Sequence, residues 1–340
     1  MITVESLEKQ LNQKQLQSIY LFYGDEKYLI ETNVKKIKNI FGECIKGINY
    51  ILIDETNIKE IISDIETPSF GYSKKLIIAK NTGLLKKEGK RKTSDISQTK
   101  ERLLKYLQEN MQIIKESVVL VFIEEEVEKQ ELYNFLDKNC TVCKFDFQKP
   151  AQLIARLKSI CNSYKVQVEN YTLQYFIECC GTNMQELINE IRKLIEYAGP
   201  NGQIKNEDID KLCIKKLESV IFDLTDSLGK RNIKLALNVL HNLIYEKEPI
   251  QKILITLYNH FKKLYLTSIA IQENKDVASS LSLKPNQVFL VNKYKMQSKY
   301  FNKKELRNIL QALIDLDYNY KNGIIDLQLG LETVLCEYCS

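Results

Sequence analysis

Gly24, Asp25 and Glu26 follow the apolar run Ile19–Tyr23, at the point where many α/β proteins bind phosphates. A phosphate-binding loop needs the pattern G-x-x-x-x-G-K-[ST], whose backbone N–H groups surround the phosphates while its lysine reaches the terminal ones. This segment has one glycine, no Gly-Lys-Ser/Thr sequence and two carboxylates. Because carboxylates repel ATP and themselves favour the positive end of a helix, we interpret Gly24, Asp25 and Glu26 as a degenerate nucleotide site.

Three further acids, Glu124–Glu126, follow the apolar run Val118–Ile123, an arrangement similar to a metal-binding Walker B strand. Glu stands where an Asp usually binds the metal, and no phosphate loop accompanies it. We therefore favour the simpler interpretation that these acids lie near the positive end of the next helix.

Cysteines and histidines give weak signals for metal or nucleophilic chemistry. The pairs Cys140/Cys143 and Cys336/Cys339 have the C-x2-C spacing of zinc sites, but they fall in predicted strand and helix segments. His241 and His260 are the only histidines, and neither belongs to a motif with a partnering acid. We expect packed thiols, no metal ion, no cofactor and no catalytic residue.

The composition is typical of a globular, largely helical protein. Of the 340 residues, 44% are hydrophobic and 27% charged, which argues against disorder, and only 12 are Gly and 5 are Pro, which argues against an all-β fold. The longest strong apolar run is far shorter than the roughly 20 residues that cross a bilayer. Nine cysteines suit a reducing compartment, so we expect cytoplasmic localisation and no membrane partner.

Strands and helices alternate in the first part of the chain. Continuous apolar runs predict strands at Ile19–Tyr23, Tyr50–Ile53, Leu76–Ala79, Val118–Ile123 and Val142–Phe147, with helices between them at about 26–41, 57–66, 99–114 and 128–138. Continuous apolarity indicates strands covered on both faces, as in a parallel sheet. We therefore expect an α/β domain over residues 1–149, with flanking helices and a polar loop at 86–99.

After Pro150 the pattern predicts helices and no further strands. Helices at 151–163, 170–180 and 183–198 indicate a small helical domain, residues 150–212. Residues 213–340 are predicted to be helical throughout, with breaks near Gly229, Pro249, 274–285 and Gly323. The expected fold is an α/β domain followed by two all-helical domains.

The net charge of +5 lies in the last of these domains, where residues 215–340 hold 18 basic and 13 acidic side chains. Its densest part is a basic segment that also carries Tyr294, Tyr300 and Phe301, with Tyr320 further on; its lysines are Lys293, Lys295, Lys299, Lys303 and Lys304. Basic and aromatic residues together are typical of nucleic-acid surfaces. A solvated helix face with its aromatics in the core is the alternative, which this segment alone favours.

A possible protein-binding tip precedes the third predicted strand. It consists of Pro68, Ser69, Phe70, Gly71 and Tyr72. An aromatic side chain on such a turn can fill a pocket of a partner, or it can fold back as a hydrophobic cap, and the sequence leaves both alternatives open.

Six segments together resemble the bacterial DNA polymerase III delta subunit family, the clamp-loader delta proteins, over nearly the whole chain. They are IYLFYGDEKYLIE (19–31), TPSFGYSKKLIIAKN (67–81), VVLVFIEEE (118–126), CGTNMQELINEIRKLIEYAG (180–199), VNKYKMQSKYFNKKEL (291–306) and YKNGIIDLQLGLETVL (320–335). The resemblance implies an AAA+-like α/β domain without ATP binding, a helical lid (150–212) and a helical collar (213–340) that joins the other subunits.

The resemblance also implies a function. Delta proteins bind the sliding clamp through two adjacent apolar residues at the tip before the third strand. Phe70 matches the second of these residues, whereas Ser69 departs from the pattern at the first. The expected partners are the beta clamp, the gamma/tau and delta prime subunits and primer–template DNA, which the basic segment and Tyr320 would face. We expect a non-catalytic subunit that holds the clamp ring open during DNA replication; the alternatives are a stand-alone DNA-binding scaffold and a degenerate AAA+ ATPase.

Overall fold

The computed structural model describes residues 1–86 and 94–338. The chain folds as two compact units, Met1–Phe147 and Gln148–Ser340. Among the described residues, no helix combines the length and the apolarity that a membrane crossing requires.

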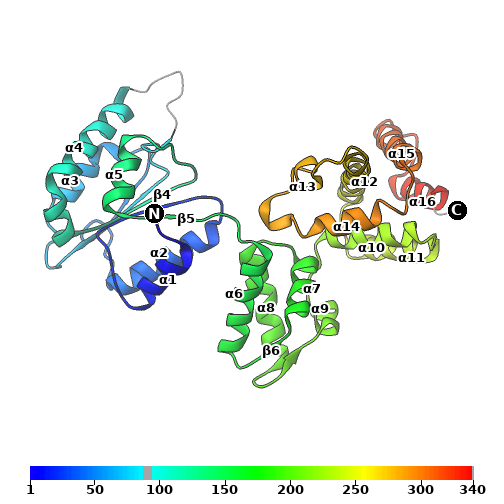
Figure 1. Ribbon diagram of the computed structural model, residues 1–340, viewed down its shortest axis with the longest axis horizontal. Coiled ribbons are helices and arrows are strands. Elements are labelled where there is room, and N and C mark those ends of the chain that lie inside the picture. Colours follow the sequence, from blue (N-terminus) through cyan, green and yellow to red (C-terminus); the bar gives the residue numbers. More distant parts are fainter. Residues whose placement is uncertain (87–93, 339–340) are drawn as a thin grey trace. The chain divides into compact units, whose positions relative to one another are not determined.

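The first unit is built on a five-stranded parallel sheet (Figure 1). Its strands are β1 (Ile19–Tyr23), β2 (Tyr50–Ile53), β3 (Lys75–Lys80), β4 (Val118–Glu124) and β5 (Thr141–Lys144), in the order β2-β3-β4-β1-β5. The parallel sheet predicted from continuous apolar runs is therefore confirmed, and only the fifth strand is shorter than expected. Because β1 lies between β4 and β5, the loops after β1 and β4 meet at one edge of the sheet.

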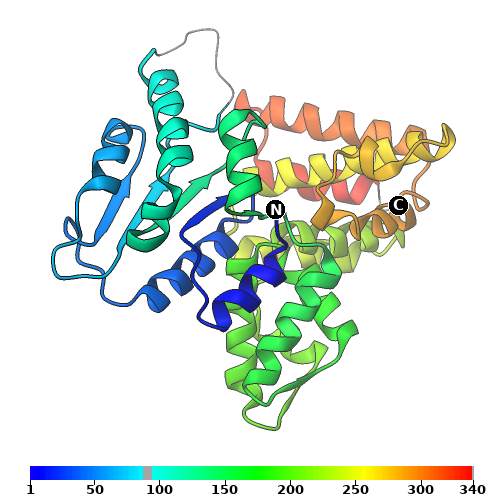
Figure 2. The same ribbon diagram turned by 60° about the vertical axis from the view of Figure 1, so that its left-hand side comes forward.

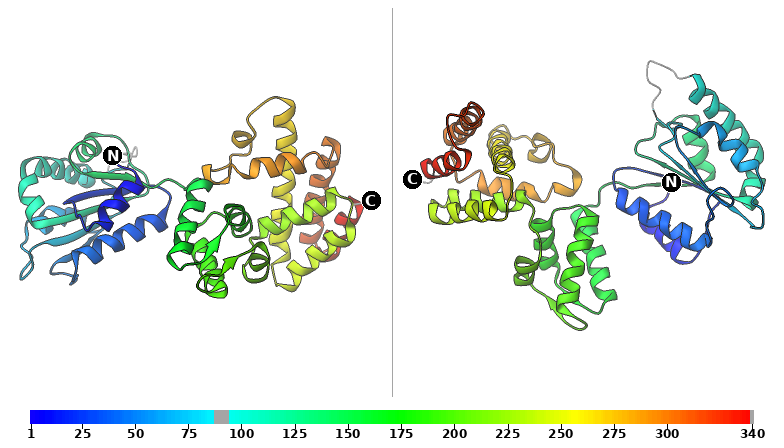
Figure 3. Two further views of the ribbon diagram at one scale, coloured as in Figure 1. Left: turned by 60° about the horizontal axis from the view of Figure 1, so that its bottom comes forward. Right: turned by 180° about the vertical axis from the view of Figure 1, so that it is seen from behind.

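Helices cover both faces of the sheet, which explains the continuous apolar strands. Successive side chains of β1 alternate: Tyr20 and Phe22 pack in one core, while Leu21 packs in the other. The first core is completed by α1 (Val4–Asn12) and α2 (Lys27–Phe41), and the second by η1 (Ile58–Glu60), α3 (Ile61–Glu66), α4 (Ser94–Ser117) and α5 (Glu131–Asn139). The two helix layers are visible from two further directions in Figure 3.

Two features of this unit differ from the sequence-based expectation. Helix α1 was not predicted as an element, although Val4, Leu7 and Leu11 form a buried stripe at helical spacing. Helix α4 begins at Ser94, so the predicted loop 86–99 is wrong for its last six residues. The remainder of that loop, 87–93, lies outside the described residues.

The second unit begins with a compact helical part. Its helices are α6 (Pro150–Ser163), α7 (Asn170–Cys180), α8 (Met184–Ala198) and α9 (Asn206–Leu212). The prediction of no strands after Pro150 is wrong, because β6 (Gln167–Val168) and β7 (Gln203–Ile204) form a short parallel pair. Two residues per strand are too few for a periodic pattern to reveal. Helix α9, too, was absent from the predicted elements.

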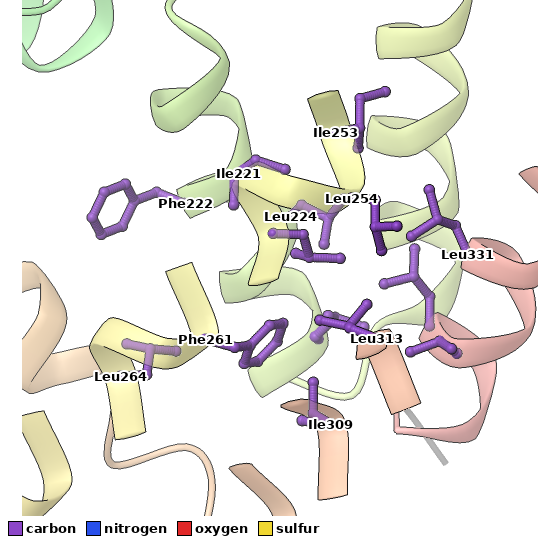
Figure 4. Close-up of a cluster of buried hydrophobic side chains, with 14 of the residues drawn as sticks. Ile221, Phe222, Leu224, Ile253, Leu254, Phe261, Leu264, Ile309, Leu313 and Leu331 are labelled. Atoms are coloured by element: carbon purple, nitrogen blue, oxygen red, sulfur yellow. The ribbon is translucent and has the colours of Figure 1, made fainter. Parts of the chain in front are cut away.

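The rest of the second unit consists of helices around one apolar core (Figure 2). These are α10 (Leu217–Gly229), α11 (Ile233–Tyr245), α12 (Ile250–Gln272), α13 (Val277–Ser280), η2 (Pro285–Gln287), α14 (Leu290–Gln297), α15 (Lys303–Lys321) and α16 (Leu327–Glu337). Figure 4 shows Leu224 of α10, Phe261 of α12 and Leu313 of α15 in this core. The predicted breaks are present, but a further break at 298–302, between α14 and α15, was not predicted. A division of the helical residues into two domains at residue 212 stays a prediction.

Candidate functional site

The predicted protein-binding tip is a tight turn between α3 and β3. The amide of Tyr72 donates to the carbonyl of Ser69 at 2.9 Å, and Gly71 has a φ of 81°. Residues 69–72 therefore form a β-turn whose third residue needs the left-handed conformation that glycine adopts easily. The Ser69 hydroxyl also donates to the Tyr72 carbonyl at 2.8 Å, so this side chain stabilises the turn and is not an apolar anchor.

Phe70 occupies the first central position of that turn, and 79% of its surface is exposed. The alternative in which Phe70 folds back as a cap over the core is therefore wrong. An exposed Phe on a turn closed by two hydrogen bonds has little conformational entropy left to lose when a partner covers it. Full burial of such a side chain stabilises a complex by roughly 1.5–3 kcal/mol.

A buried lysine fixes the segment that leads into the tip. Lys75 is 2% exposed, and its Nζ donates to the carbonyls of Asp64, at 2.7 Å, and Thr67, at 2.5 Å. Both carbonyls belong to the last turn of α3 and its C-cap, so the ammonium group satisfies acceptors that a helix end leaves free. Burial lowers the pKa of Lys75. No local pattern signals this role, because Lys74 and Lys75 are adjacent lysines that the sequence does not distinguish.

Tyr72 lies on the other side of the turn and is half buried. Its hydroxyl donates to Oε2 of Glu43 at 3.3 Å, which links the turn to residues 42–49. The same loop contacts the start of β3, where the amide of Leu76 donates to the carbonyl of Asn49 at 2.7 Å. Phe70 is thus the exposed aromatic side chain of the tip, whereas Tyr72 supports the turn.

Gly24, Asp25 and Glu26, the predicted degenerate nucleotide site, form the connection between β1 and α2. Gly24 has a φ of 124°, and a Cβ atom there would lie 2.4 Å from the carbonyl oxygen of Phe145. The amide of Glu26, the N-cap of α2, donates to that same carbonyl at 3.0 Å. The chain leaving β5 therefore occupies the close approach that a phosphate would need. Glu26 is buried and Asp25 exposed beside it, which adds negative charge.

The acidic run after β4 is explained by local contacts. Glu124 is 1% exposed, and its Oε1 accepts from the amide and the hydroxyl of Thr82 at 2.9 and 2.7 Å. Burial raises the pKa of Glu124. Oε1 of Glu125 pairs with Nζ of Lys27 at 2.7 Å. The expectation that these acids lie at the start of the next helix is wrong, because α5 begins only at Glu131.

A cavity of about 370 Å³ opens beside these residues, at the carboxyl ends of β1, β3 and β4. Ligands of open α/β sheets commonly bind at such ends. Its polar lining mixes both charges: the bases are Lys27, Lys35, Lys38 and Lys80, and the acids are Glu31, Glu124 and Glu125. This mixture lacks the one-sided positive field that a triphosphate requires.

The basic segment of the second unit is only partly arranged as predicted. Lys295, Lys299 and Lys304 are exposed, and Lys303 is exposed while donating to Oε1 of Gln272 at 3.2 Å. Lys293 differs from these exposed lysines, because its Nζ forms an ion pair with Oε2 of Glu178 on α7 at 2.6 Å. Its contribution to a shared basic surface is therefore reduced.

For two of the four aromatic residues the alternative, a ring in the core, holds; a role of Tyr320 at a DNA surface stays a prediction. Tyr294 and Phe301 are 3% and 4% exposed, and the ring of Tyr300 packs against Gly229. Tyr320 is half buried, and its hydroxyl accepts from Nε2 of Gln251 at 2.9 Å. The rings of Tyr294 and Phe301 are therefore not available to stack on a base, whereas Tyr300 and Tyr320 keep part of their surface exposed. The helical spacing alone did not tell a core-facing ring from an exposed one.

Burial or a hydrogen-bond partner within the fold accounts for most of the thiols and for both histidines. Cys143 is buried, Cys140 is half buried, and Cys336 is exposed, while Cys339 lies outside the described residues. His260 is buried against Gln297, and His241 lies 3.0 Å from Oε1 of Glu332. Among the described residues, one group has metal-ligand geometry, Cys180, Glu190 and Cys213, which the sequence analysis missed because its cysteines are far apart in the chain.

Comparison with known proteins gives consistent matches over both units. The family model for the DNA polymerase III delta subunit matches residues 20–146, and that for the C-terminal domain of the same subunit matches residues 218–338. The DNA polymerase III subunit delta of Bacillus subtilis is 25% identical over 335 residues, which are 97% of this chain and 95% of that protein.

Two further matches agree. The probable DNA polymerase III subunit delta of Aquifex aeolicus is 30% identical over 315 residues, 88% of this chain and 85% of that protein. The solved structure of the Bacillus subtilis DNA clamp loader delta protein (YqeN) covers 99% of both chains with a TM-score of 0.72 at 23% identity, so it shares the fold. With matches of this extent to an α/β unit and a helical unit in the same order, the chain belongs to the DNA polymerase III delta subunit family.

Proposed function

We propose that this chain is a non-catalytic subunit of a clamp loader, which binds the sliding clamp (the beta subunit), holds its ring open and helps load it on primed DNA. The observation that carries the proposal is Phe70, a large apolar side chain held out on a rigid turn. Membership of the family supports the clamp as the partner. Replication of bacterial DNA takes place in the cytoplasm, where the protein would act.

Phe70 supplies only part of the binding free energy that opening the clamp requires. Its burial in a pocket of the clamp supplies about one to two decades of affinity. Shifting a clamp from almost fully closed to almost fully open takes a differential affinity of about 5.5 kcal/mol. Since Ser69 offers no apolar surface here, other contacts of the first unit must distinguish the open ring from the closed one.

ATP would act through the partner subunits, gamma/tau and delta prime, rather than through this chain. The Glu26 amide is bonded to Phe145, and Asp25 lies exposed beside it, so α2 offers no anion site of the usual kind. The partners would control access to the Phe70 tip, and the helices from residue 213 onward would join them. A degenerate ATPase is thus the less favoured function.

The test is to measure ATP binding and clamp opening with the same purified chain. We expect no micromolar ATP binding by calorimetry, together with separation of a fluorophore pair placed across one interface of the cognate clamp. Micromolar ATP binding would contradict the assigned degenerate site and favour the ATPase. A clamp that binds the chain but keeps its fluorophores together would contradict the opening function.

The exposed lysines give a separate prediction for DNA. Changing Lys299 and Lys303 together to Glu should weaken DNA binding by the assembled loader. The slope of the logarithm of the binding constant against the logarithm of the salt concentration should also become shallower, by about one unit per lost phosphate contact. Clamp binding should be unchanged. Fluorescence anisotropy on primed DNA over a series of salt concentrations measures the effect.

The matched control is Lys234→Glu with Lys247→Glu, which makes the same change of charge in the first turn of α11 and just beyond its C-cap. Equal losses in both double variants would show a general effect of net charge. Strong DNA binding by the isolated wild-type chain would instead favour the stand-alone scaffold, which the buried aromatic residues already disfavour.

A further inference from the structure

Three side chains with metal-binding atoms meet where the helical part α6–α9 continues into α10. The thiols of Cys180 and Cys213 and a carboxylate oxygen of Glu190 all lie within 4.8 Å of one another. Cys180 ends α7, Glu190 lies in the middle of α8, and Cys213 is the C-cap of α9. Three helices that pack against one another thus each contribute one ligand atom (Figure 1).

The surrounding contacts hold these three residues together without a metal ion. The amide of Lys216 donates to the carbonyl of Cys179 at 2.8 Å, and the amide of Ile214 donates to Oε2 of Glu190 at 3.0 Å. Nζ of Lys193 bonds both to Oε2 of Glu190, at 2.6 Å, and to the carbonyl of Leu212, at 3.1 Å. The segment carrying Cys213 is therefore fixed beside α7 and α8 by bonds on both sides of the thiol.

The chemistry of this set matches a thiophilic divalent cation. Zn²⁺ binds thiolate sulfur at about 2.3 Å and carboxylate oxygen at about 2.0–2.2 Å, which separates the ligand atoms of a tetrahedron by roughly 3.5–3.8 Å. The three ligand atoms lie within 4.8 Å of one another without a metal ion, which is near that spacing. Ca²⁺ and Mg²⁺ prefer all-oxygen ligand sets and do not match.

Charge and access also favour a cation. Two thiolates and one carboxylate carry three negative charges, and the ammonium group of Lys193 offsets one of them. One Zn²⁺ cancels the remaining two. Cys180 and Cys213 stand at the C-terminal ends of α7 and α9, where the helix dipole attracts cations. Glu190 and Cys213 are half buried, so an ion can reach them from the solvent. A water molecule then completes the coordination of the ion.

We propose that Cys180, Glu190 and Cys213 bind one zinc ion, which cross-links α7, α8 and the segment that leads into α10. The bound ion fastens residues 213–216, the connection between two helical parts of the second unit. This site does not depend on the proposed clamp binding.

Zinc alone is the probe that tests the site, with the full-length Cys336→Ser variant as the reference protein. This background removes the exposed thiol of Cys336, so that zinc binding reports on the buried and half-buried cysteines. We expect one Zn²⁺ per chain by competition with a chromophoric chelator, a higher melting temperature with zinc, and thiolate-to-metal charge-transfer absorption when Co²⁺ replaces it.

Adding Cys213→Ser should weaken zinc binding by roughly a hundredfold or more and abolish the thermal shift. Glu190→Gln, which keeps the shape of the side chain, should weaken zinc binding as well. If the Cys213→Ser variant does not fold, the zinc affinity of Glu190→Gln tests the proposal. The proposal is overturned if the reference protein binds no zinc, if it forms a Cys180–Cys213 disulfide in place of the metal site, or if the variants bind zinc as it does.

Discussion

Replacing Phe70 by Ala is expected to weaken binding to the sliding clamp by at least about tenfold, with no change in the melting temperature. The side chain is 79% exposed in the free chain, so truncation removes no core contact. In a complex the same side chain would be covered, and its loss would cost roughly 1.5–3 kcal/mol, which corresponds to about one to two decades in Kd. Surface plasmon resonance with immobilised clamp measures the change, and calorimetry checks the melting temperature.

The control for this experiment is Tyr245→Ala. Tyr245 ends α11 in the second unit and is 88% exposed, so its truncation removes a similar amount of exposed aromatic surface far from the tip in sequence. We expect wild-type clamp affinity from it. An unchanged affinity of Phe70→Ala would show that the clamp binds elsewhere, and a large fall in its melting temperature would show that Phe70 stabilises the fold.

The sequence was most informative where a pattern is long and is enforced by burial. All five strands of the sheet were predicted because each is a run of apolar residues, and such runs are required where helices cover both faces. Breaks between the later helices were predicted where Gly or Pro residues mark them, and the break at 298–302, which has neither, was missed. The turn at the tip was predictable for a similar reason, since Gly71 follows Phe70 and Pro68 ends the helix before it.

The sequence was least informative where distant residues meet. Nothing in the pattern distinguishes buried Lys75 from Lys74, because the distinction depends on where the carbonyls of α3 end. Tyr294 and Phe301 looked like nucleic-acid contacts, since composition does not reveal the side of a helix that faces the core. Cys180 and Cys213 approach each other only because α7 and α9 pack together. Such arrangements arise from tertiary structure and leave no local signal.

His260 illustrates how such an arrangement changes the chemistry of a side chain. It is buried on α12, with its ring edge-on to Phe222 at 4.5 Å between centroids. Its Nε2 lies 2.8 Å from Oε1 of Gln297, whose Nε2 donates to the carbonyl of Phe222 and to Oδ1 of Asp226 at 2.9 and 2.7 Å. Because the amide nitrogen of Gln297 is the donor there, its oxygen must accept, and Nε2 of His260 carries the proton.

A second proton on this imidazole is disfavoured. Burial is the main cause that lowers the pKa of His260 to about 4; the Gln297 hydrogen bond opposes the shift, and the positive charge of Lys263 adds to it. An unfolded chain protonates the same histidine at about pH 6.5. Between these two values the unfolded state binds a proton that the folded state does not, so the free energy of unfolding must fall as the pH falls.

We therefore expect the second unit to lose on the order of 2 kcal/mol of stability through His260 alone between about pH 7.5 and about pH 5, and somewhat more by about pH 4. His260→Gln, which does not titrate, should remove this part of the pH dependence. The measurement is urea unfolding followed by circular dichroism at both pH values, taken as the difference between wild type and variant so that other titrating groups cancel.

His241→Gln is the matched control, because that imidazole is half exposed on α11 rather than enclosed among aromatic rings. We expect it to keep the part of the pH dependence that His260 contributes. If His260→Gln showed the same pH dependence as the wild type, the imidazole of His260 would have to accept a proton as readily in the fold as in water. That requires α12 and α14 to separate on acidification and to admit water. Faster hydrogen exchange of α12 amides at the lower pH would then reveal that opening directly.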